Sequence, residues 1–380
     1  MRSGSAWDDL LAAYALCAGD ETWEWFQSRA EPVQTMSEQG WARLGEFLRK
    51  NKELLAELRA FAAAGQPWYE IDLSDPANLR FDHFSPMRDF ARLLAAQCVC
   101  DRHTNDVDAA FENLVAVYQV GEVLAEEPLV ISQLVRLAIH GIGQWWLEST
   151  FQPGDLTPEQ SRALIEVLHG IDYQTSLSQS LYIEAERGLS TFDCVRAGEI
   201  SGVAYVWGDR LFFRVYGSSV GRPWLNLDEG AYAMTMQRAA ETAGQPYFEG
   251  LGMMREIQEE VDRLPYTRVM TRRFVAAEMR CLAIHARYAA MRDLCWLGLS
   301  VETYATEHGE YPATLEVAVP AHQLPPDPYT GQDFRYTHTQ DGFTLYSLGP
   351  DGVDVGGTQG SARSQEGDLV WRGTQQQSSM

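Results

Sequence analysis

The spacing of the apolar residues restricts this chain of 380 residues more than any other feature. From Trp7 to about Leu264, apolar side chains recur every three or four positions with polar breaks between the segments. This is the pattern of helices that bury one face. One such segment runs through residues 41–58 and ends near Gly65. No fixed repeat period separates the segments, so the sequence favours an irregular helical bundle over a repeat array.

The same pattern predicts further helices along the chain. The Pro153-Gly154-Asp155 break is followed by Thr157 as a helix N-cap, with proline in the first helical position. Residues 198–224 are dominated by Gly, Val, Tyr, Trp and Phe, and we expect an irregular excursion or a short buried helix there. The other predicted helices are 87–103, 106–125, 128–149, one ending near 169, 172–196, 228–244, 246–262 and a long one over 266–308.

The charge balance excludes one large class of partner. The chain carries 53 acidic and 30 basic residues, a formal net charge of -23. An acidic protein of this kind repels phosphate backbones and anionic lipid surfaces, so we expect no nucleic acid partner. Hydrophobic residues make up 45% of the chain and charged residues 22%. This is the composition of a folded protein and not of a disordered one.

Neither the cysteines nor the N-terminal residues identify the cellular compartment of the protein. The chain has six cysteines and no paired CxxC motif, and Cys98 and Cys100 would point apart on a helix. We therefore favour buried free thiols over a disulfide or a metal site. No apolar run is long enough to cross a membrane. The first five residues resemble a cloning remnant, which leaves open an N-terminal membrane anchor ahead of them.

The amino-acid composition of the sequence changes after His308-Gly309, where proline-rich loops begin. Residues 334–337 and 343–346 are predicted strands, and Gln340-Asp341-Gly342 is the predicted turn between them. We therefore expect a β-hairpin. The following residues up to Trp371 are rich in Gly, Asp and Ser. The polar end of the chain, from about 373 to 380, is expected to be a disordered tail.

Five short motifs follow one another in this region, and together they resemble the C-terminal part of the major pseudopilin of type II secretion systems. They are Tyr311-Pro312, Asp327-Pro328, Phe334-Arg-Tyr336, Tyr346-Ser-Leu-Gly349-Pro-Asp351-Gly352, and Glu366-Gly-Asp368 followed by Trp371. In that family a long helix leads into a small sheet, and a glycine-rich acidic loop binds calcium. The resemblance implies a small α+β module made of a long helix and a short antiparallel sheet.

The resemblance covers about residues 270–372, and it departs from the family in its helix. A pseudopilin helix begins with a transmembrane half, whereas here about 260 residues precede the helix, and arginines such as Arg273 and Arg287 interrupt it. Such a helix cannot form the membrane-buried core of a filament. The whole chain resembles planctomycete-type envelope proteins in which an anchor precedes a helical region and a pseudopilin-like ending. That resemblance implies a location in the cell envelope and no particular activity.

The resemblance also implies calcium ligands. Calcium needs six to eight hard oxygen ligands, which carboxylates and the carbonyls of a glycine-rich turn supply. Among the acidic candidates, Asp354 is included only because it lies nearby in sequence. A solvated loop closed by hydrogen bonds, without metal, is the alternative reading. The candidate ligands are the carboxylates of Asp351, Asp354, Glu366 and Asp368, and the carbonyls near Leu348 and Val353.

The helical region holds one weak set of catalytic candidates. Glu184, Arg136 and His285, together with Glu186 and His140, could support acid/base chemistry if they met. Glu184 and Glu186 lie on different faces of a helix, however, and an Arg136–Glu184 pair could equally tie two helices together. The tryptophans Trp145, Trp146, Trp207 and Trp224 leave a similar choice between a pocket and the core.

These observations lead to one reading of the whole chain. We expect a helical domain over residues 1–265 and a pseudopilin-like module over 266–372. The expected function is that of a non-catalytic, envelope-associated scaffold that binds a protein partner, with calcium stabilising the C-terminal loop. The alternative is an enzyme or a small-ligand-binding protein with its site inside the helical domain.

Overall fold

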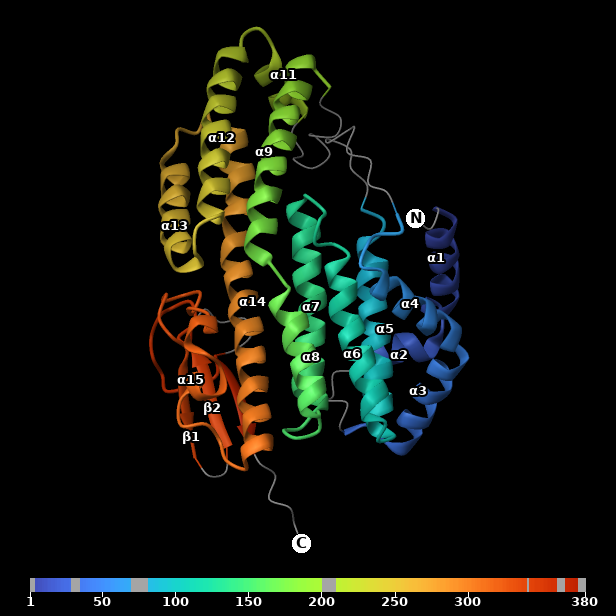
Figure 1. The fold of residues 1–380 in the computed structure, drawn as a ribbon. Coiled ribbons are helices and arrows are strands. Elements are labelled where there is room, and N and C mark those ends of the chain that lie inside the picture. The colour runs from blue at the N-terminus through green and yellow to red at the C-terminus, as the bar shows by residue number, and fades with distance from the viewer. Residues whose placement is uncertain are drawn as a thin grey trace. The chain divides into compact units, whose positions relative to one another are not determined.

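The computed structural model of the protein describes residues 4–28, 35–69, 81–199, 210–339, 342–360 and 366–374. These residues are mainly helical, with one three-stranded antiparallel sheet near the C-terminus (Figure 1). The predicted fold class, a helical bundle followed by a small α+β region, is confirmed at this level. No helix among the described residues is both long enough and apolar enough to cross a lipid bilayer.

The described chain divides into two compact units. The first contains the described residues of 1–71, 81–125 and 135–167, and the second contains those of 126–134 and 168–380. Residues 168–265 therefore belong with the C-terminal module, whereas the sequence interpretation placed them with the preceding helices. The physical reason is the packing of the long C-terminal helix, which contacts the helices of 168–265.

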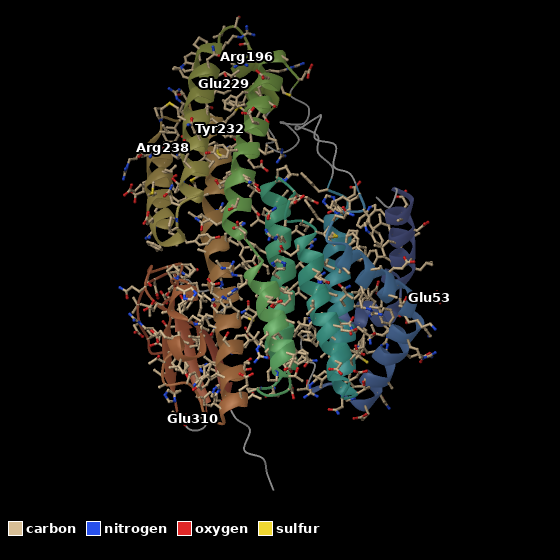
Figure 2. The ribbon with its side chains drawn as sticks, viewed as in Figure 1. Glu53, Arg196, Glu229, Tyr232, Arg238 and Glu310 are labelled. Atoms are coloured by element: carbon tan, nitrogen blue, oxygen red, sulfur yellow. The ribbon has the colours of Figure 1, made fainter. Side chains whose placement is uncertain are left out.

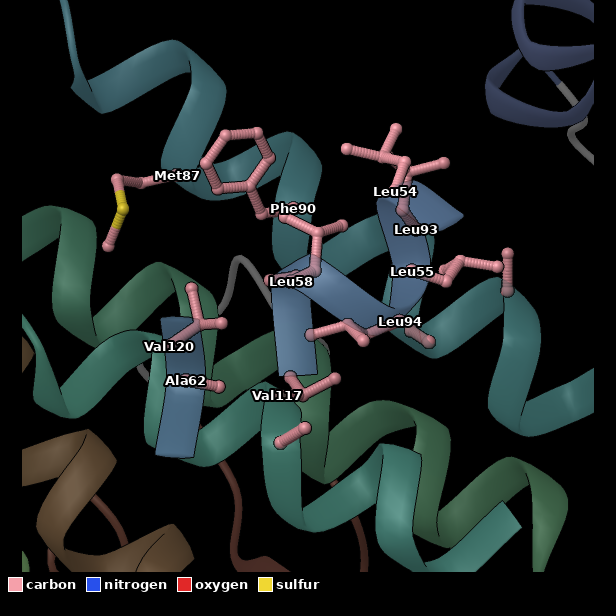
Figure 3. Close-up of a cluster of buried hydrophobic side chains, with 14 of the residues drawn as sticks. Leu54, Leu55, Leu58, Ala62, Met87, Phe90, Leu93, Leu94, Val117 and Val120 are labelled. Atoms are coloured by element: carbon pink, nitrogen blue, oxygen red, sulfur yellow. The ribbon is translucent and has the colours of Figure 1, made fainter. Parts of the chain in front are cut away.

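The first unit is built from helices, and all of them except the last contribute to one apolar core. They are α1(Gly4–Ala18), α2(Glu21–Gln27), α3(Glu38–Lys50), α4(Lys52–Ala64), α5(Phe84–His103), α6(Val107–Glu122), most of α7(Val130–Thr150) and most of α8(Pro158–His169). Figure 3 shows Leu58, Phe90 and Val117 meeting in this core from α4, α5 and α6. The predicted helix over 41–58 is interrupted at Asn51, which separates α3 from α4.

Side chains at the helix starts fix several of these boundaries. Thr157 and Gln160 form a reciprocal capping box: Gln160 N–H donates to Thr157 Oγ1 at 3.2 Å, and Thr157 N–H donates to Gln160 Oε1 at 2.9 Å. The predicted N-cap is thus confirmed. Asp172 caps α9 in the same way, because its Oδ1 accepts the amides of Gln174 and Thr175.

The second unit contains the remaining helices and the sheet. Its helices are α9(Tyr173–Ala197), α11(Arg210–Gly217), α12(Arg222–Ala243), α13(Tyr247–Arg263), α14(Val269–His308), α15(Leu315–Ala318) and the 3-10 turn η3(Ala321–Gln323). Figure 1 shows α9, α12 and α13 beside the first half of α14, and the sheet beside its second half. The short α11 falls within the stretch 198–224, whose residues 200–209, including Trp207, lie outside the described part of the chain.

The sheet has the order β1-β2-β3 with antiparallel pairing. The strands are β1(Arg335–His338), β2(Gly342–Ser347) and β3(Leu369–Thr374), and Tyr346 of β2 pairs with Arg335 and Val370. The predicted strands match β1 and β2, although the turn residues 340 and 341 lie outside the described residues. Strand β3 was not predicted, and it includes Gly373 and Thr374, which the sequence interpretation assigned to the tail.

Candidate functional site

The three catalytic candidates lie in separate polar clusters. Arg136 on α7 belongs to the first unit, while Glu184 on α9 and His285 on α14 belong to the second. The pair suggested between Arg136 and Glu184 is wrong, because the guanidinium of Arg136 binds Glu122 and the carboxylate of Glu184 binds Arg187.

Arg136 is the centre of a buried ion pair between α6 and α7. Its Nε and Nη2 donate to the two carboxylate oxygens of Glu122 at 2.9 and 3.0 Å. His140, one turn later, places Nε2 3.3 Å from Glu122 Oε1 and 3.1 Å from the Tyr118 carbonyl. A side chain at position 121 would overlap the His140 ring, so Gly121 permits this approach. The cluster ties two helices together by a bidentate, charge-assisted contact.

Glu184 takes part in a second cluster, formed by α9, α12 and α14. Arg187 Nη1 donates to both carboxylate oxygens of Glu184 at 2.6 and 2.7 Å, and the Tyr232 hydroxyl donates to the Glu184 carbonyl at 3.0 Å. Figure 2 labels Tyr232, which projects from α12 toward α9. A side chain at position 188 would overlap the Tyr232 hydroxyl, so Gly188 leaves the space for this contact.

Glu278 on α14 is the member of this cluster that can exchange a proton near neutral pH. Burial and the negative charge of Glu184 raise its pKa from 4.5 to about 7, against the opposing effect of Arg187. Burial and the same two carboxylates raise the pKa of Cys281 to about 12, so its thiol stays protonated. Sequence reasoning found Glu184 but not Glu278, because the two meet only when α9 packs on α14.

His285 and Glu186 lie apart from this chemistry. The Nδ1 atom of His285 is 2.8 Å from the Cys281 carbonyl of its own helix, and the side chain is buried. Glu186 is exposed, as expected for a residue on another face of α9 from Glu184. The arrangement of Glu184, Arg187 and Glu278 is thus a carboxylate pair with one cation, and His285 is a helix-internal contact.

The predicted calcium loop is closed by hydrogen bonds from carboxylates to backbone amides. Asp351 Oδ1 accepts the Val353 amide at 3.1 Å and its Oδ2 accepts the Gly367 amide at 3.0 Å. Both amides lower the pKa of Asp351. Asp354 Oδ1 accepts the Gly356 amide at 2.9 Å and the Tyr346 hydroxyl at 3.2 Å. These carboxylates act as turn-forming acceptors that fold the loop on itself.

Asp368 and Glu366 contrast in burial. Asp368 is fully buried; its Oδ2 accepts the Gly357 amide at 2.7 Å, while its Oδ1 has no hydrogen-bond partner among the described residues. Glu366 is exposed. Within the described part of the chain, no three acidic, histidine or cysteine side chains come together as metal ligands would. The predicted carboxylates are therefore not gathered into one set in the described residues, although Asp368 Oδ1 is a buried oxygen of the kind that a cation binds.

The remaining motifs of the C-terminal module do meet in space. Asp327 Oδ1 accepts the Ser347 hydroxyl at 2.9 Å, and its Oδ2 accepts the Leu348 amide at 3.3 Å. The Tyr336 hydroxyl donates to the Pro312 carbonyl at 2.9 Å. Residues that the sequence interpretation ordered into five motifs thus hold one another in a single folded module. The Leu348 amide points to Asp327, a contact that sequence reasoning did not foresee.

A buried aspartate of α12 binds the first turn of α14, and sequence reasoning missed it. Asp228, on α12, accepts the Met270 and Thr271 amides at 2.8 and 3.1 Å, and the Thr271 hydroxyl at 2.6 Å. The Tyr216 hydroxyl lies 2.8 Å from Asp228 Oδ2. A side chain of α12 therefore caps another helix, the longest in the unit. The sequence signal that could have indicated this contact is an aspartate on the apolar stripe of α12. A carboxylate buried there requires hydrogen-bond donors from another segment.

Three segments form an apolar hollow beside this cap. The hollow has a volume of about 320 Å³, and its lining includes Phe212, Val215, Tyr216, Trp224, Tyr266 and Val269. Trp224, which the sequence left open between pocket and core, therefore lines a pocket. None of Glu184, Arg136 and His285 lines it.

We call the region around this hollow the tip surface, defined as α11, residues 218–227 and residues 264–269. Figure 1 shows α11 at the end of α9 and α12 that lies away from the sheet. The tip surface exposes apolar side chains from each segment, with 55% of Val215, 71% of Val220 and 88% of Tyr266 accessible to solvent. Such a grouping of exposed apolar side chains marks a surface that binds something.

Comparison with known proteins adds no family to this description. The chain matches no protein-family model, no curated protein and no solved structure.

Proposed function

We propose that the protein is a non-catalytic scaffold of the cell envelope that docks on its partner through the tip surface. The observation that carries this proposal is the apolar hollow with exposed aromatic and aliphatic side chains around it. Exposed apolar patches of this kind mark surfaces that bind a partner. The envelope location rests on the resemblance of the C-terminal module to pseudopilins and remains a proposal.

The packing below the tip surface supports a scaffold role. The Asp228 carboxylate connects α12 to the first turn of α14, and the Tyr216 hydroxyl connects α11 to Asp228 and to the Thr267 carbonyl just before α14. Farther along α14, Arg292 donates to Asp293 and to the Ile171 carbonyl. The second unit therefore links its tip surface to its sheet through one helix of 40 residues. A scaffold needs this kind of rigid connection between separate surfaces.

Site-specific photo-crosslinking tests the docking function. A photoreactive amino acid at Val220 is placed in the tip surface, and the same amino acid at Met234 serves as the control, because both side chains are about seven-tenths exposed on the second unit. In cells that make the protein naturally, the proposal expects a protein or lipid adduct at position 220 that is missing at 234. Identical adduct patterns at the two positions would contradict it.

Calcium stabilisation of the C-terminal loop is a separate part of the proposal. Asp368 Oδ1 supports it, since a buried carboxylate oxygen without a donor gains from a cation. Calcium at about 100 times its dissociation constant would add about 2.7 kcal/mol to the free energy of unfolding. The expected result is a higher melting temperature with calcium, reversed by a chelator and lost in Asp368→Asn. Asp333→Asn, at an exposed position outside the loop, is the control.

A melting curve that calcium and chelator leave unchanged would remove calcium from the proposal. The docking function would be unaffected, because the tip surface contains none of the loop residues.

The second candidate function is a small-ligand or catalytic site between α9 and α14. The carboxyl of Glu278, with its pKa near 7 beside Glu184, favours it, since a proton donor and acceptor near neutral pH suits acid/base chemistry. A metabolite screen by thermal shift would test this idea. A ligand that stabilises the wild type but not Glu278→Gln or Glu184→Gln would support the second function over the first.

A further inference from the structure

The tip surface is basic in a strongly acidic protein. The tip surface, residues 210–227 and 264–269, contains four arginines and no aspartate or glutamate, whereas the whole chain has a net charge of -23. The hollow brings these two segments together, because Phe212 and Trp224 line it from the first segment and Tyr266 and Val269 from the second. The reversal of charge is therefore concentrated at one place in the fold.

The arginines of the tip surface are available to a partner. Arg214 and Arg222 are exposed, and neither they nor Arg268 form an ion pair with any described residue. The nearest acidic residues along α12 are already engaged. Asp228 is buried and accepts the amides that begin α14, and Glu229 is paired with Arg196, as Figure 2 shows.

The cations lie among apolar side chains that project into solvent. Val220 and Leu227 are 71% and 57% exposed, and Trp224 and Tyr266 carry a polar group on an apolar ring. Arg272 lies over the Tyr266 ring at 5.2 Å, so cation and aromatic ring already stack here. Apolar and aromatic residues flanked by arginine are the combination that enters the boundary between lipid headgroups and acyl chains.

We propose that the tip surface docks on an anionic lipid surface. Arg214, Arg222 and Arg268 would contact the headgroups, and Val220, Trp224 and Tyr266 would enter the layer beneath them. This inference rests on the proposed docking function and names its partner. The net negative charge was expected to repel anionic lipid surfaces, and this holds for most of the molecule but not for the basic tip surface. The repulsion elsewhere favours the orientation in which the tip surface faces the membrane.

A lipid surface fits these observations better than a protein groove does. The projecting side chains come from three separate segments. A fluid headgroup layer accepts them without a matching shape. Each arginine close to an anionic surface contributes about fivefold to binding. Three arginines that form no ion pair with a described residue, next to four exposed apolar side chains, therefore provide both the electrostatic and the hydrophobic contribution that stable interfacial binding requires.

Vesicle co-sedimentation with the full chain tests the proposal. The probe is a vesicle with one third phosphatidylglycerol in phosphatidylcholine, and the comparison is a vesicle of phosphatidylcholine alone. We expect binding to the anionic vesicle at low ionic strength, and much weaker binding at high ionic strength, because salt screens the contribution of the arginines. Binding to both vesicles alike, or to neither, would overturn the proposal.

Two double variants locate the binding on the protein. Arg214→Glu with Arg222→Glu should weaken binding to the anionic vesicle by about tenfold or more. Val220→Ser with Tyr266→Ser should weaken it at both ionic strengths, since it removes the apolar contribution. Met234→Ser with Arg255→Glu changes an exposed methionine and an exposed arginine elsewhere on α12 and α13, and should leave binding unchanged. Equal losses in the tip and control variants would overturn the proposal.

The outcome also separates this inference from the proposed function. If the anionic vesicle does not bind while the crosslink at position 220 joins a protein, the lipid inference fails and the docking function stands. If the tip variants change the oligomeric state instead, the tip surface joins two copies of the chain and the lipid inference fails. If position 220 yields no specific adduct and no vesicle binds, both fail.

Discussion

Two carboxylates, the buried one of Asp228 and the half-buried one of Glu302, lie at opposite ends of α14 and have very different surroundings. Asp228, at the first turn of the helix, accepts two backbone amides and the Thr271 hydroxyl and faces the Tyr216 hydroxyl. Glu302, in the last turns, is approached by the Trp371 indole at 3.4 Å, and burial raises its pKa to about 7. The number of donors decides what a buried carboxylate does: Asp228 is a structural tie, whereas Glu302 can become neutral.

The comparison also separates the two packing surfaces of α14. At its first half the helix is held by polar contacts to α11 and α12, which fix its start and the tip surface together. At its second half the contact with the sheet is mostly apolar, through the Trp371 ring against Gly298. We therefore expect polar substitutions to disturb the first half and steric substitutions to disturb the second.

Asp228→Ala should have the largest effect. It removes a buried acceptor and leaves the Met270 and Thr271 amides without a cap, so we expect a loss of about 3 to 5 kcal/mol in the free energy of unfolding. Urea unfolding followed by circular dichroism measures the loss, and hydrogen exchange at the two amides locates it. Tyr216→Phe removes one hydroxyl of the same cluster and should cost about 1 kcal/mol. Equal costs for the two variants would show that Asp228 is not the central acceptor.

Glu302→Gln should have an intermediate effect that depends on pH. The pKa of Glu302 in the fold, about 7, lies above its ordinary value of 4.5. Stability from the neutral carboxyl is therefore fully present below about pH 4.5 and is lost as the pH rises through 7. The glutamine variant stays neutral and should be more stable than the wild type by about 2 kcal/mol near pH 8, with little difference near pH 4.

Thermal unfolding at the two pH values measures this difference. Glu310→Gln makes the same change of charge at an exposed position near the end of α14, labelled in Figure 2, and controls for net charge. A glutamine variant at 302 that is less stable than the wild type near pH 8 would show that the ionised carboxylate contributes to the fold.

The sequence predicted the elements of the second unit better than its polar contacts. The long helix was expected over 266–308 and spans Val269–His308, because its apolar periodicity is unbroken. Strand β3 was missed, since the Gly, Asp and Ser residues before it are typical of loops. A strand of six residues next to such a loop has too little pattern of its own to be recognised without its partner strand.

The candidate site shows the same limit. Glu184 was found from the sequence because it lies beside Glu186 in one helix, but Glu278 is almost a hundred residues away and joins it only through packing. The hollow of the tip surface was missed for a similar reason, since Phe212, Trp224 and Tyr266 come from separate segments. Residue types can be read locally, whereas a pocket or a shifted pKa depends on which helices pack together.

Gly298→Ala should have the smallest effect, and its sign tests the apolar half of the comparison. A methyl group at position 298 would overlap the Trp371 ring, so the indole must move away from α14. Overpacking of this kind costs about 1 to 3 kcal/mol, from which the better helix propensity of alanine subtracts up to about 1 kcal/mol. Gly230→Ala, on α12, has no atom in the way and should stabilise the protein by a few tenths to about 1 kcal/mol.

The two substitutions are chemically identical, and opposite signs in thermal unfolding would show that the second half of α14 is held by close packing against the sheet. If both variants are more stable than the wild type, Trp371 is not closely packed on the helix.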